Sequence, residues 1–445
     1  MSVSTAVKAA HPLWERLGIP KPLILGYVGV LLFMIGDGVE SNYLTPFLQD
    51  HNGMDVQRVG LLVTVYGMVV AVSSWLAAAF SDLWGPKRVM LIGATGWVVF
   101  EVIFLAFGVA ADNETVIFLA YAARGMGYPL FAFGFLVWIA AVADRARLAT
   151  AIGWFYVSFT AGLPTLGALI ANGSIPVLGP LNTLWLSLGL VVAGSLVALL
   201  GLREKTGSRP LVRPGDKAFG TLSLGLKLMA TRPKVLCASI IRMLNTAPQY
   251  GSFVFFPVLF ADRFNFGLSG WLLLTTIIYA ANIPFNVIFG MLGDRIGWRN
   301  TVRWFGAVFS GVSLLALYYL PAWTGSYPLA VLAGIAFGIA LAGFVPLSAL
   351  TAGLEPGHPG AVMSAYNIGM GASVAVGPLL VALFYDSLGQ EGMVWLFAGC
   401  YGLAALLTLA FRPTDERTRT GNKTKLEEKE PRLDTVGTRH LKTCG

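Results

Sequence analysis

Four ionisable residues inside long apolar stretches are the clearest chemical signal in this sequence. Asp37 and Glu40 are three residues apart in the apolar run 23–47, and Glu101 and Arg124 interrupt two other runs. A charge at the centre of a bilayer costs about 3 kcal/mol even on insertion scales. A charged residue at such a position therefore pairs with another group, lines a water-filled path or has a function. Burial favours a protonated carboxylate, whereas a nearby arginine favours the ionised form. A carboxylate–arginine pair that opens and closes would therefore bind and release a proton, so we predict that these four residues couple proton movement.

Helix geometry places the four residues at similar depths. At about 1.5 Å per residue, Asp37 lies roughly 21 Å and Glu101 roughly 18 Å from the end that we expect to be cytoplasmic. Arg124 comes out at about 18 Å and Glu40 near 25 Å in a core of about 30 Å. All four should face a bundle interior, and the glycines flanking Asp37 fit close helix approach. Asp37 is the first choice for coupling and Glu40 for substrate binding, although the roles are interchangeable. The alternative is a permanent ion pair that only fixes helix packing.

The composition requires a membrane environment. The chain has 445 residues, of which 56% are hydrophobic and 12% charged, against about 25% charged in a typical soluble domain. The net charge of +8 could suggest nucleic acid, but the basic residues lie in short loops and tails, as expected beside a lipid bilayer. The cysteines and histidines are scattered and no glycine-rich phosphate loop occurs. We therefore expect no metal, no cofactor, no nucleic-acid partner, no ATP-driven pump and no enzyme.

Apolar runs long enough to cross a bilayer occur twelve times, and each predicts a transmembrane helix. The runs are 23–47, 59–80, 88–110, 116–142, 148–171, 181–202, 235–260, 271–292, 302–321, 327–352, 361–385 and 392–411. Most of the 31 Lys and Arg residues then fall on the N-terminal side of the membrane. The positive-inside rule predicts that both termini are cytoplasmic in a multi-pass protein of the cell inner membrane.

A polar, proline-containing stretch divides these runs into two sets of six. The predicted organisation is a cytoplasmic N-terminal segment 1–21, a six-helix bundle 22–202, a cytoplasmic connector 203–234, a second bundle 235–411 and a flexible cytoplasmic tail 412–445. Pairs of residues recur in the same order in both halves. These pairs are Asp82 and Asp294, Pro46 with Asp50 and Pro257 with Asp262, and Tyr156 with Gly167 and Tyr366 with Gly377. The recurrence indicates a duplicated six-helix unit.

Twelve helices, a basic central loop and a repeated loop of the form G-x-x-x-D-R-x-G-x-R resemble the major facilitator superfamily. The second copy, around Asp294, fits the pattern; the first, around Asp82, departs from it with Ala78 and Leu83. The resemblance implies an all-α integral membrane fold of two pseudo-symmetric bundles that rock about a central site. The charges near these loops would latch helices in one state, although a plain turn with basic anchors is the alternative. The predicted gating residues are Asp82, Arg88, Arg242, Asp294, Arg295 and Arg299.

Several segments in both halves resemble, more narrowly, the ribitol and D-arabinitol transporters. These segments are Gly36–Glu40, Arg124–Phe131, Arg242–Thr246, Val302–Gly306, Leu354–His358 and Tyr366–Asn367. The resemblance implies a polyol permease that takes up pentitols by proton symport, and we expect a monomer. A polyol has many hydroxyls and no charge, so neutral amides and aromatic faces suit it. The candidate binding residues, besides Glu40, are Tyr128, Trp154, Tyr156, Asn245, Gln249, Asn282 and Asn367.

Purely structural roles are the alternative for these residues. Each amide would serve equally as an interhelical hydrogen bonder, most aromatic side chains pack or face lipid, and Arg242 suits a gate or a snorkelling position as well as a ligand. Other cargoes also fit the fold: a sugar, or a small organic acid, which would need a free arginine. Antiporters of this superfamily resemble one another in a glycine-proline motif on the fifth helix. Here Leu163 separates Gly162 from Pro164, which disfavours a drug/proton antiporter. A channel would not need duplicated halves with paired latches.

Overall fold

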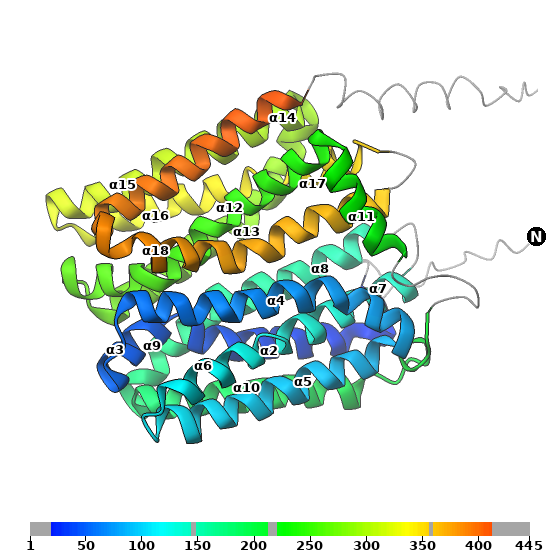
Figure 1. The fold of residues 1–445 in the computed structure, drawn as a ribbon, viewed down its shortest axis with the longest axis horizontal. Helices are drawn as coiled ribbons and strands as arrows, with labels where there is room; N and C mark the ends of the chain where they lie inside the picture. Colours follow the sequence, from blue (N-terminus) through cyan, green and yellow to red (C-terminus); the bar gives the residue numbers. More distant parts are fainter. Residues whose placement is uncertain (1–18, 144–147, 212–219, 356–358, 412–445) are drawn as a thin grey trace, which may run out of the picture.

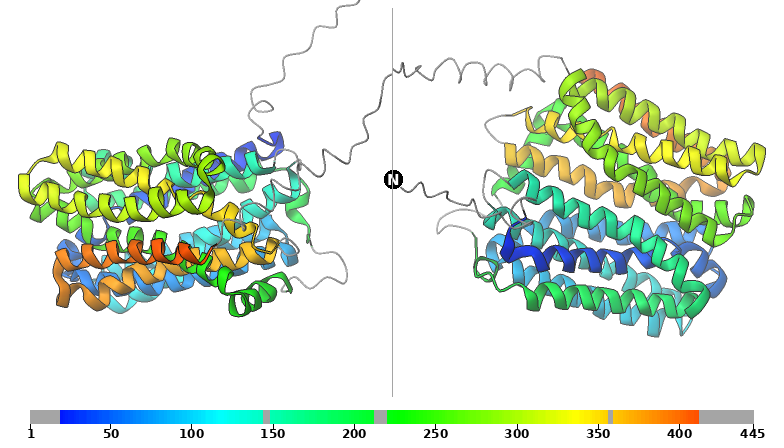
Figure 2. Two further views of the ribbon diagram at one scale, coloured as in Figure 1. Left: turned by 90° about the horizontal axis from the view of Figure 1, so that it is seen from above. Right: turned by 180° about the vertical axis from the view of Figure 1, so that it is seen from behind.

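The structure is a computed structural model that describes residues 19–143, 148–211, 220–355 and 359–411. The described residues form helices and connecting turns, with no strand among them. The helices run side by side along the long axis of the molecule (Figure 1), and views from above and behind show the same bundle (Figure 2). The predicted N-terminal segment up to residue 18, the tail 412–445 and the middle of the connector, 212–219, lie outside the described residues.

The described residues of the first half form nine α-helices. They are α2 (Ile24–Ser41), α3 (Leu44–Asn52), α4 (Val56–Trp84), α5 (Pro86–Ile103), α6 (Glu114–Arg124), α7 (Gly134–Val142), α8 (Leu148–Thr160), α9 (Gly167–Leu178) and α10 (Pro180–Gly201). Short π-helical segments at Phe104–Val109, Pro129–Phe133 and Ala161–Leu166 continue α5, precede α7 and join α8 to α9. The pieces on either side of a π-helical segment therefore act together as one membrane-length rod.

The second half repeats this arrangement. Its helices are α11 (Gly220–Thr231), α12 (Pro233–Val258), α13 (Gly267–Ile296), α14 (Trp298–Asn300), α15 (Phe309–Thr324), α16 (Tyr327–Ala342), α17 (Pro346–Ala352) and α18 (Pro359–Leu407). Figure 1 shows the helices up to α10 on one side of the bundle and those from α11 onward on the other. The expected pair of helical bundles is therefore visible in the fold.

Ten helical stretches of the described chain are long and apolar enough to cross a membrane, against the twelve that the sequence predicts. Two differences account for the gap. The first is α12, which is not one of the ten because Arg242, Asn245 and Gln249 lower its hydropathy. The second is the run 362–410, which is continuous although Gly389 in it has non-helical backbone angles. The sequence treats that run as two spans, separated close to this glycine.

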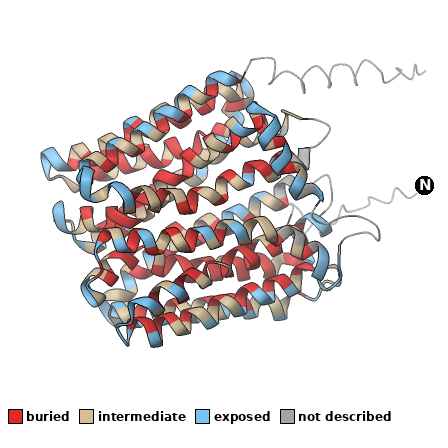
Figure 3. Ribbon diagram, viewed as in Figure 1, coloured by how far each residue is buried: buried red, intermediate tan, exposed pale blue. Residues whose placement is uncertain are grey.

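The first bundle packs closely around the segment that carries Asp37. Ser187 Oγ on α10 donates a 2.7 Å hydrogen bond to the carbonyl of Gly36 on α2. A Cβ atom at Gly38 would lie 2.0 Å from the carbonyl oxygen of Leu163, so only glycine permits this approach. Buried residues concentrate along the inner faces of the helices (Figure 3). The close approach expected from the glycines beside Asp37 is therefore present.

The two halves meet through α4 against α18 and through α9 against α13. Gly67 of α4 faces the carbonyl of Val374 on α18, where a Cβ would lie only 2.5 Å from that oxygen. Trp271 Nε1 on α13 donates a 3.0 Å hydrogen bond to the carbonyl of Asn42 at the end of α2. The two halves of the chain are thus in direct contact.

Candidate functional site

The four ionisable residues singled out by their depth lie together inside the first bundle. Asp37 and Glu40 are on α2, Glu101 is on α5 and Arg124 ends α6; their exposed fractions are 4, 0, 0 and 1%. Nη1 of Arg124 donates to Glu40 Oε2 at 2.7 Å and also to Glu101 Oε2. One guanidinium nitrogen therefore holds two carboxylates. We call these four residues the buried charge cluster.

Three aromatic rings surround the guanidinium of Arg124. Its Cζ lies 4.3 Å from the ring centroid of Tyr121, 4.8 Å from that of Trp97 and 5.6 Å from that of Tyr66. Such contacts stabilise a cation that has left water. The sequence argument did not single out Trp97 or Tyr121. Their spacing offered a signal, because Trp97 is four residues before Glu101 and Tyr121 three before Arg124, which places each pair on one helix face.

Asp37 has a different partner from the two glutamates. Trp97 Nε1 donates a 2.9 Å hydrogen bond to Asp37 Oδ1, while Glu40 and Glu101 share Arg124. The cluster therefore contains three carboxylates and one cation. Ionised groups without a counter-charge are expensive in a dry interior. The arrangement is chemically suited to hold at least one proton and to release it when a partner moves.

A second polar region lies where the two halves meet. The hydroxyl of Tyr128, in the first half, interacts with that of Tyr250 on α12, and Asp37 acts electrostatically on both. Tyr250 was not predicted, although it directly follows Gln249 on the polar stripe of α12. The buried charge cluster is therefore electrostatically linked to groups from the opposite half.

Arg242 occupies this interface on the second half. Its Cζ lies 5.6 Å from the ring centroid of Tyr366 on α18, and its charge also acts on Tyr156 of α8 in the first half. Tyr156 is 39% exposed. Tyr156 and Tyr366 are the pair that the internal repeat relates, so the duplication places equivalent tyrosines around one cation.

The amides predicted to bind substrate fall into two groups. Asn245 is 3% exposed, and within the described chain its Oδ1 has no hydrogen-bond partner; the neighbouring Gln249 bonds the Asn245 carbonyl at 3.0 Å. Asn282, in contrast, donates a 2.9 Å bond to the Gly338 carbonyl and so joins α13 to α16, which matches the alternative of an interhelical hydrogen bond. Asn367 is exposed and Trp154 is half-buried. Asn245 and Gln249 thus remain the amides with spare capacity at the centre.

Apart from Arg242, which lies within α12, the predicted gating residues lie near helix ends. Arg88 and Arg295 are exposed, and Arg299 Nη1 donates a 3.1 Å hydrogen bond to the Phe411 carbonyl. Asp82 is near the end of α4 and Asp294 near the end of α13, but their side chains lie outside the described part of the structure. The latch between these charges stays a prediction.

The chain belongs to the Major Facilitator Superfamily, whose family model matches residues 26–280 and 238–443. It is similar to the α-ketoglutarate permease of Bacillus subtilis (38% identity over 93% of this chain and 94% of the relative). It is also similar to the D-arabinitol and ribitol transporters of Klebsiella pneumoniae, each at 34% identity, over 89% and 88% of this chain and 94% and 92% of theirs. The protein is accordingly a multi-pass membrane transporter and not an enzyme.

Solved structures agree on the fold. The nucleoside transporter NupG superposes with a TM-score of 0.69 at 16% identity, covering 88% of this chain and 99% of that one. The peptide transporter POT in complex with alafosfalin gives a TM-score of 0.72 at 14% identity, covering 89% and 95%. At such low identities the likeness extends to the architecture alone.

Proposed function

We propose that this protein imports a pentitol together with protons by alternating access. The observation that carries the coupling is the buried charge cluster, in which three carboxylates at nearly zero exposure are accompanied by one arginine that pairs with two of them. A shortage of counter-charge gives a carboxylate reason to take up a proton, and a moving arginine gives it reason to release one. Asp37 is the proposed coupling residue, with Glu101 and Arg124 as its partners in the cycle.

The cargo is proposed from the groups where the halves meet. Tyr128, Tyr250, Asn245 and Gln249 offer neutral donors and acceptors, which an uncharged polyol needs to replace its lost water. Two relatives carry the names D-arabinitol transporter and ribitol transporter. Tyr156, Trp154 and Asn367 are proposed to contact the cargo, and Glu40 to accept a hydroxyl hydrogen when Arg124 releases it.

We also propose the location, orientation and oligomeric state of the protein. It is a monomer in the cell inner membrane. Both termini are cytoplasmic, because the basic residues gather on that side of the membrane. Arg88, Arg242, Arg295 and Arg299, with Asp82 and Asp294, would hold one end closed in part of the cycle.

Uptake into proteoliposomes tests the proposal. Labelled ribitol, D-arabinitol, xylitol and xylose are offered with and without an inward proton gradient, to wild type and to Asp37→Asn and Glu40→Gln. We expect pentitol accumulation that depends on the gradient, and its loss in Asp37→Asn with exchange of internal for external pentitol retained. Full gradient-driven uptake by both variants would contradict the proposed coupling role of the two carboxylates. Xylose uptake without pentitol uptake would contradict the proposal that a pentitol is the cargo.

A small organic acid is the second candidate cargo, and one observation favours it. No described carboxylate forms an ion pair with Arg242, whose Nε is buried without a hydrogen-bond partner in the described chain. A relative also carries the name α-ketoglutarate permease. Competition separates the cargoes: α-ketoglutarate should block ribitol uptake in wild type but not in Arg242→Gln if the anion is carried. Ribitol uptake that α-ketoglutarate does not affect removes this candidate.

A further inference from the structure

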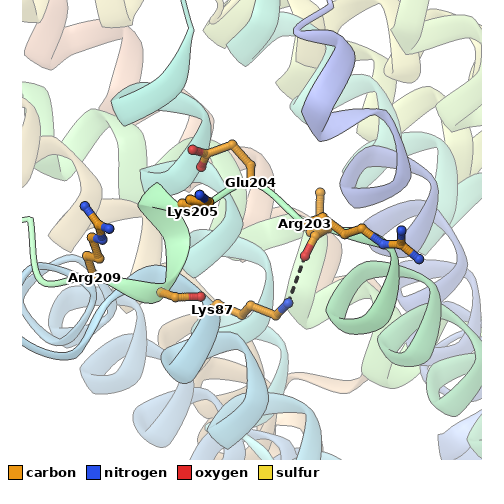
Figure 4. Close-up of a pocket in the computed structure, with 7 residues that line it drawn as sticks. Lys87, Arg203, Glu204, Lys205 and Arg209 are labelled. Atoms are coloured by element: carbon orange, nitrogen blue, oxygen red, sulfur yellow. Dashed lines mark hydrogen bonds between the residues drawn. The ribbon is translucent and has the colours of Figure 1, made fainter.

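An open surface cavity of about 310 Å³ lies where the first bundle meets the connector. Its lining contains four cationic side chains and one carboxylate: Lys87, Arg203, Lys205, Arg209 and Glu204. In the view of Figure 4, Lys87 lies between Arg203 and Arg209. The cavity therefore concentrates positive charge in one open hollow of the surface.

The one carboxylate of the cavity is already occupied. Glu204 Oε2 accepts a 2.7 Å hydrogen bond from Trp138 Nε1, and its Oε1 accepts bonds of 2.9 and 2.8 Å from the backbone N–H and hydroxyl of Thr206. Partial burial acts to raise the pKa of Glu204, but these hydrogen bonds outweigh it and hold the pKa below the ordinary value. Glu204 thus shapes the loop, and the four cations are left with an excess of charge.

The cations are held on packed backbone rather than on a loose tail. Lys87 Nζ donates a 2.8 Å hydrogen bond to the Leu202 carbonyl, the contact drawn in Figure 4, which leaves further N–H donors of that ammonium group available. Gly207 lies so close to Trp138 that a Cβ would come within 2.1 Å of the indole ring. The backbone from Leu202 to Arg209 is therefore fixed against the first bundle, and the side chains of Arg203, Lys205 and Arg209 are exposed on it.

The depth of the cavity matches the level of lipid headgroups. Lys87 is the second residue of the candidate span Pro86–Val109, and Leu202 directly follows the span Pro180–Gly201. The adjacent Trp84 is 42% exposed, as is usual for an aromatic residue at a membrane interface. Phosphate groups of anionic lipids attract basic residues at this level on the cytoplasmic side, and arginine binds phosphate oxygens in a bidentate manner.

We propose that the cavity lined by Lys87, Arg203, Lys205 and Arg209 binds a phosphate-bearing anion at the membrane surface, of the kind presented by an anionic phospholipid headgroup. The bound phosphate would bridge the start of α5 to the start of the connector. It would thereby hold the end of the first bundle to the segment that leads into the second.

Thermal unfolding of the full-length protein in detergent tests the site with three probes: phosphatidylglycerol, phosphatidylcholine and inorganic phosphate. We expect phosphatidylglycerol to raise the unfolding temperature in a saturable manner, since a ligand of the folded state stabilises it, and phosphatidylcholine to have little effect. In Lys87→Gln/Arg209→Gln the apparent affinity should fall roughly thirtyfold. Lys227→Gln, an exposed cation on α11 outside the cavity, is the matched control and should change it less than twofold.

The comparison of phosphatidylglycerol with inorganic phosphate distinguishes a lipid headgroup from a soluble phosphate. Saturation by phosphatidylglycerol alone identifies a lipid headgroup, whereas equal stabilisation by inorganic phosphate, lost in the same double variant, identifies a soluble phosphate ligand. The proposal is overturned if neither probe stabilises wild type, or if Lys227→Gln weakens binding as much as the double variant. If the double variant is poorly folded, Lys205→Glu serves as the test in its place. Its position is exposed, so the variant should fold, and its reversed charge should abolish binding.

Discussion

Trp97 Nε1 donates a 2.9 Å hydrogen bond to Asp37 Oδ1, while the same indole lies 4.8 Å from the Arg124 guanidinium. One buried side chain therefore touches both the carboxylate that lacks an ion pair and the cation that holds the other two carboxylates. This places Trp97 between the two parts of the buried charge cluster. A movement of α5 would change both contacts together.

Trp97→Phe should impair coupling more than binding. The phenyl ring keeps an aromatic face for Arg124 but removes the only described donor to the ionised Asp37 carboxylate, and a hydrogen bond to a charged group is worth about 1.5–3 kcal/mol. We expect gradient-driven uptake to fall roughly tenfold or more, with exchange across the membrane less affected. Uptake and exchange in proteoliposomes measure the difference. Trp185→Phe, at a 39% exposed position of α10, is the control, and equal loss in both variants would contradict the role of Trp97.

Arg124→Gln should destabilise the folded protein because it leaves Glu40 and Glu101 buried without their cation. Removing one partner of a buried ion pair typically costs about 3–5 kcal/mol. The double variant Arg124→Gln/Glu40→Gln removes one of the stranded charges and should recover part of that loss, since residues in contact are not additive. The unfolding temperature in detergent reports both effects. Additive losses in the double variant would show that the two side chains are not energetically coupled.

The depth of the charged residues could be predicted from the sequence, but their neighbours could not. A helix rises by a constant amount per residue, so counting residues brings Asp37, Glu101 and Arg124 to one level, where the structure has them in one cluster. Which helices pack against each other depends on tertiary contacts that residue counting does not contain. For that reason Trp97 and Tyr250 were missed, although each lies near a predicted residue on its own helix.

The same limit explains the amides. Asn282 and Asn245 look alike in sequence, since each lies in an apolar run and is followed four residues later by a second amide. The structure bonds Asn282 to the Gly338 backbone, at a place where a Cβ on Gly338 would lie 2.0 Å from the Ile278 carbonyl. A close helix crossing of this kind consumes the amide as an interhelical bond. Only the three-dimensional contact distinguishes it from Asn245.

The carboxylate of Glu204 should make stability depend on acid pH. Its pKa is lower in the folded protein than the ordinary value, so on acidification the unfolded chain takes up a proton first. The contribution to stability is therefore complete above the ordinary glutamate pKa of about 4.3 and is lost as the pH falls through the lower folded value. The unfolding temperatures of wild type and Glu204→Gln should differ at pH 7 and converge in acid. Glu114→Gln, which breaks a surface pair with Arg58, should give little difference at either pH.

Gly67→Ala should slow transport by disturbing the contact between the halves. A Cβ at this position would lie 2.5 Å from the Val374 carbonyl oxygen, and overpacking of this kind costs about 1–3 kcal/mol. The arrangement with α4 pressed against α18 would then lose population by about fivefold or more, and uptake that passes through it should slow accordingly. Gly153→Ala on α8 is the matched control, since nothing lies within 4 Å of its added Cβ and alanine favours a helix. Initial uptake rates of the two variants decide the matter: wild-type rates in Gly67→Ala would show that the cycle does not require this close approach of α4 and α18.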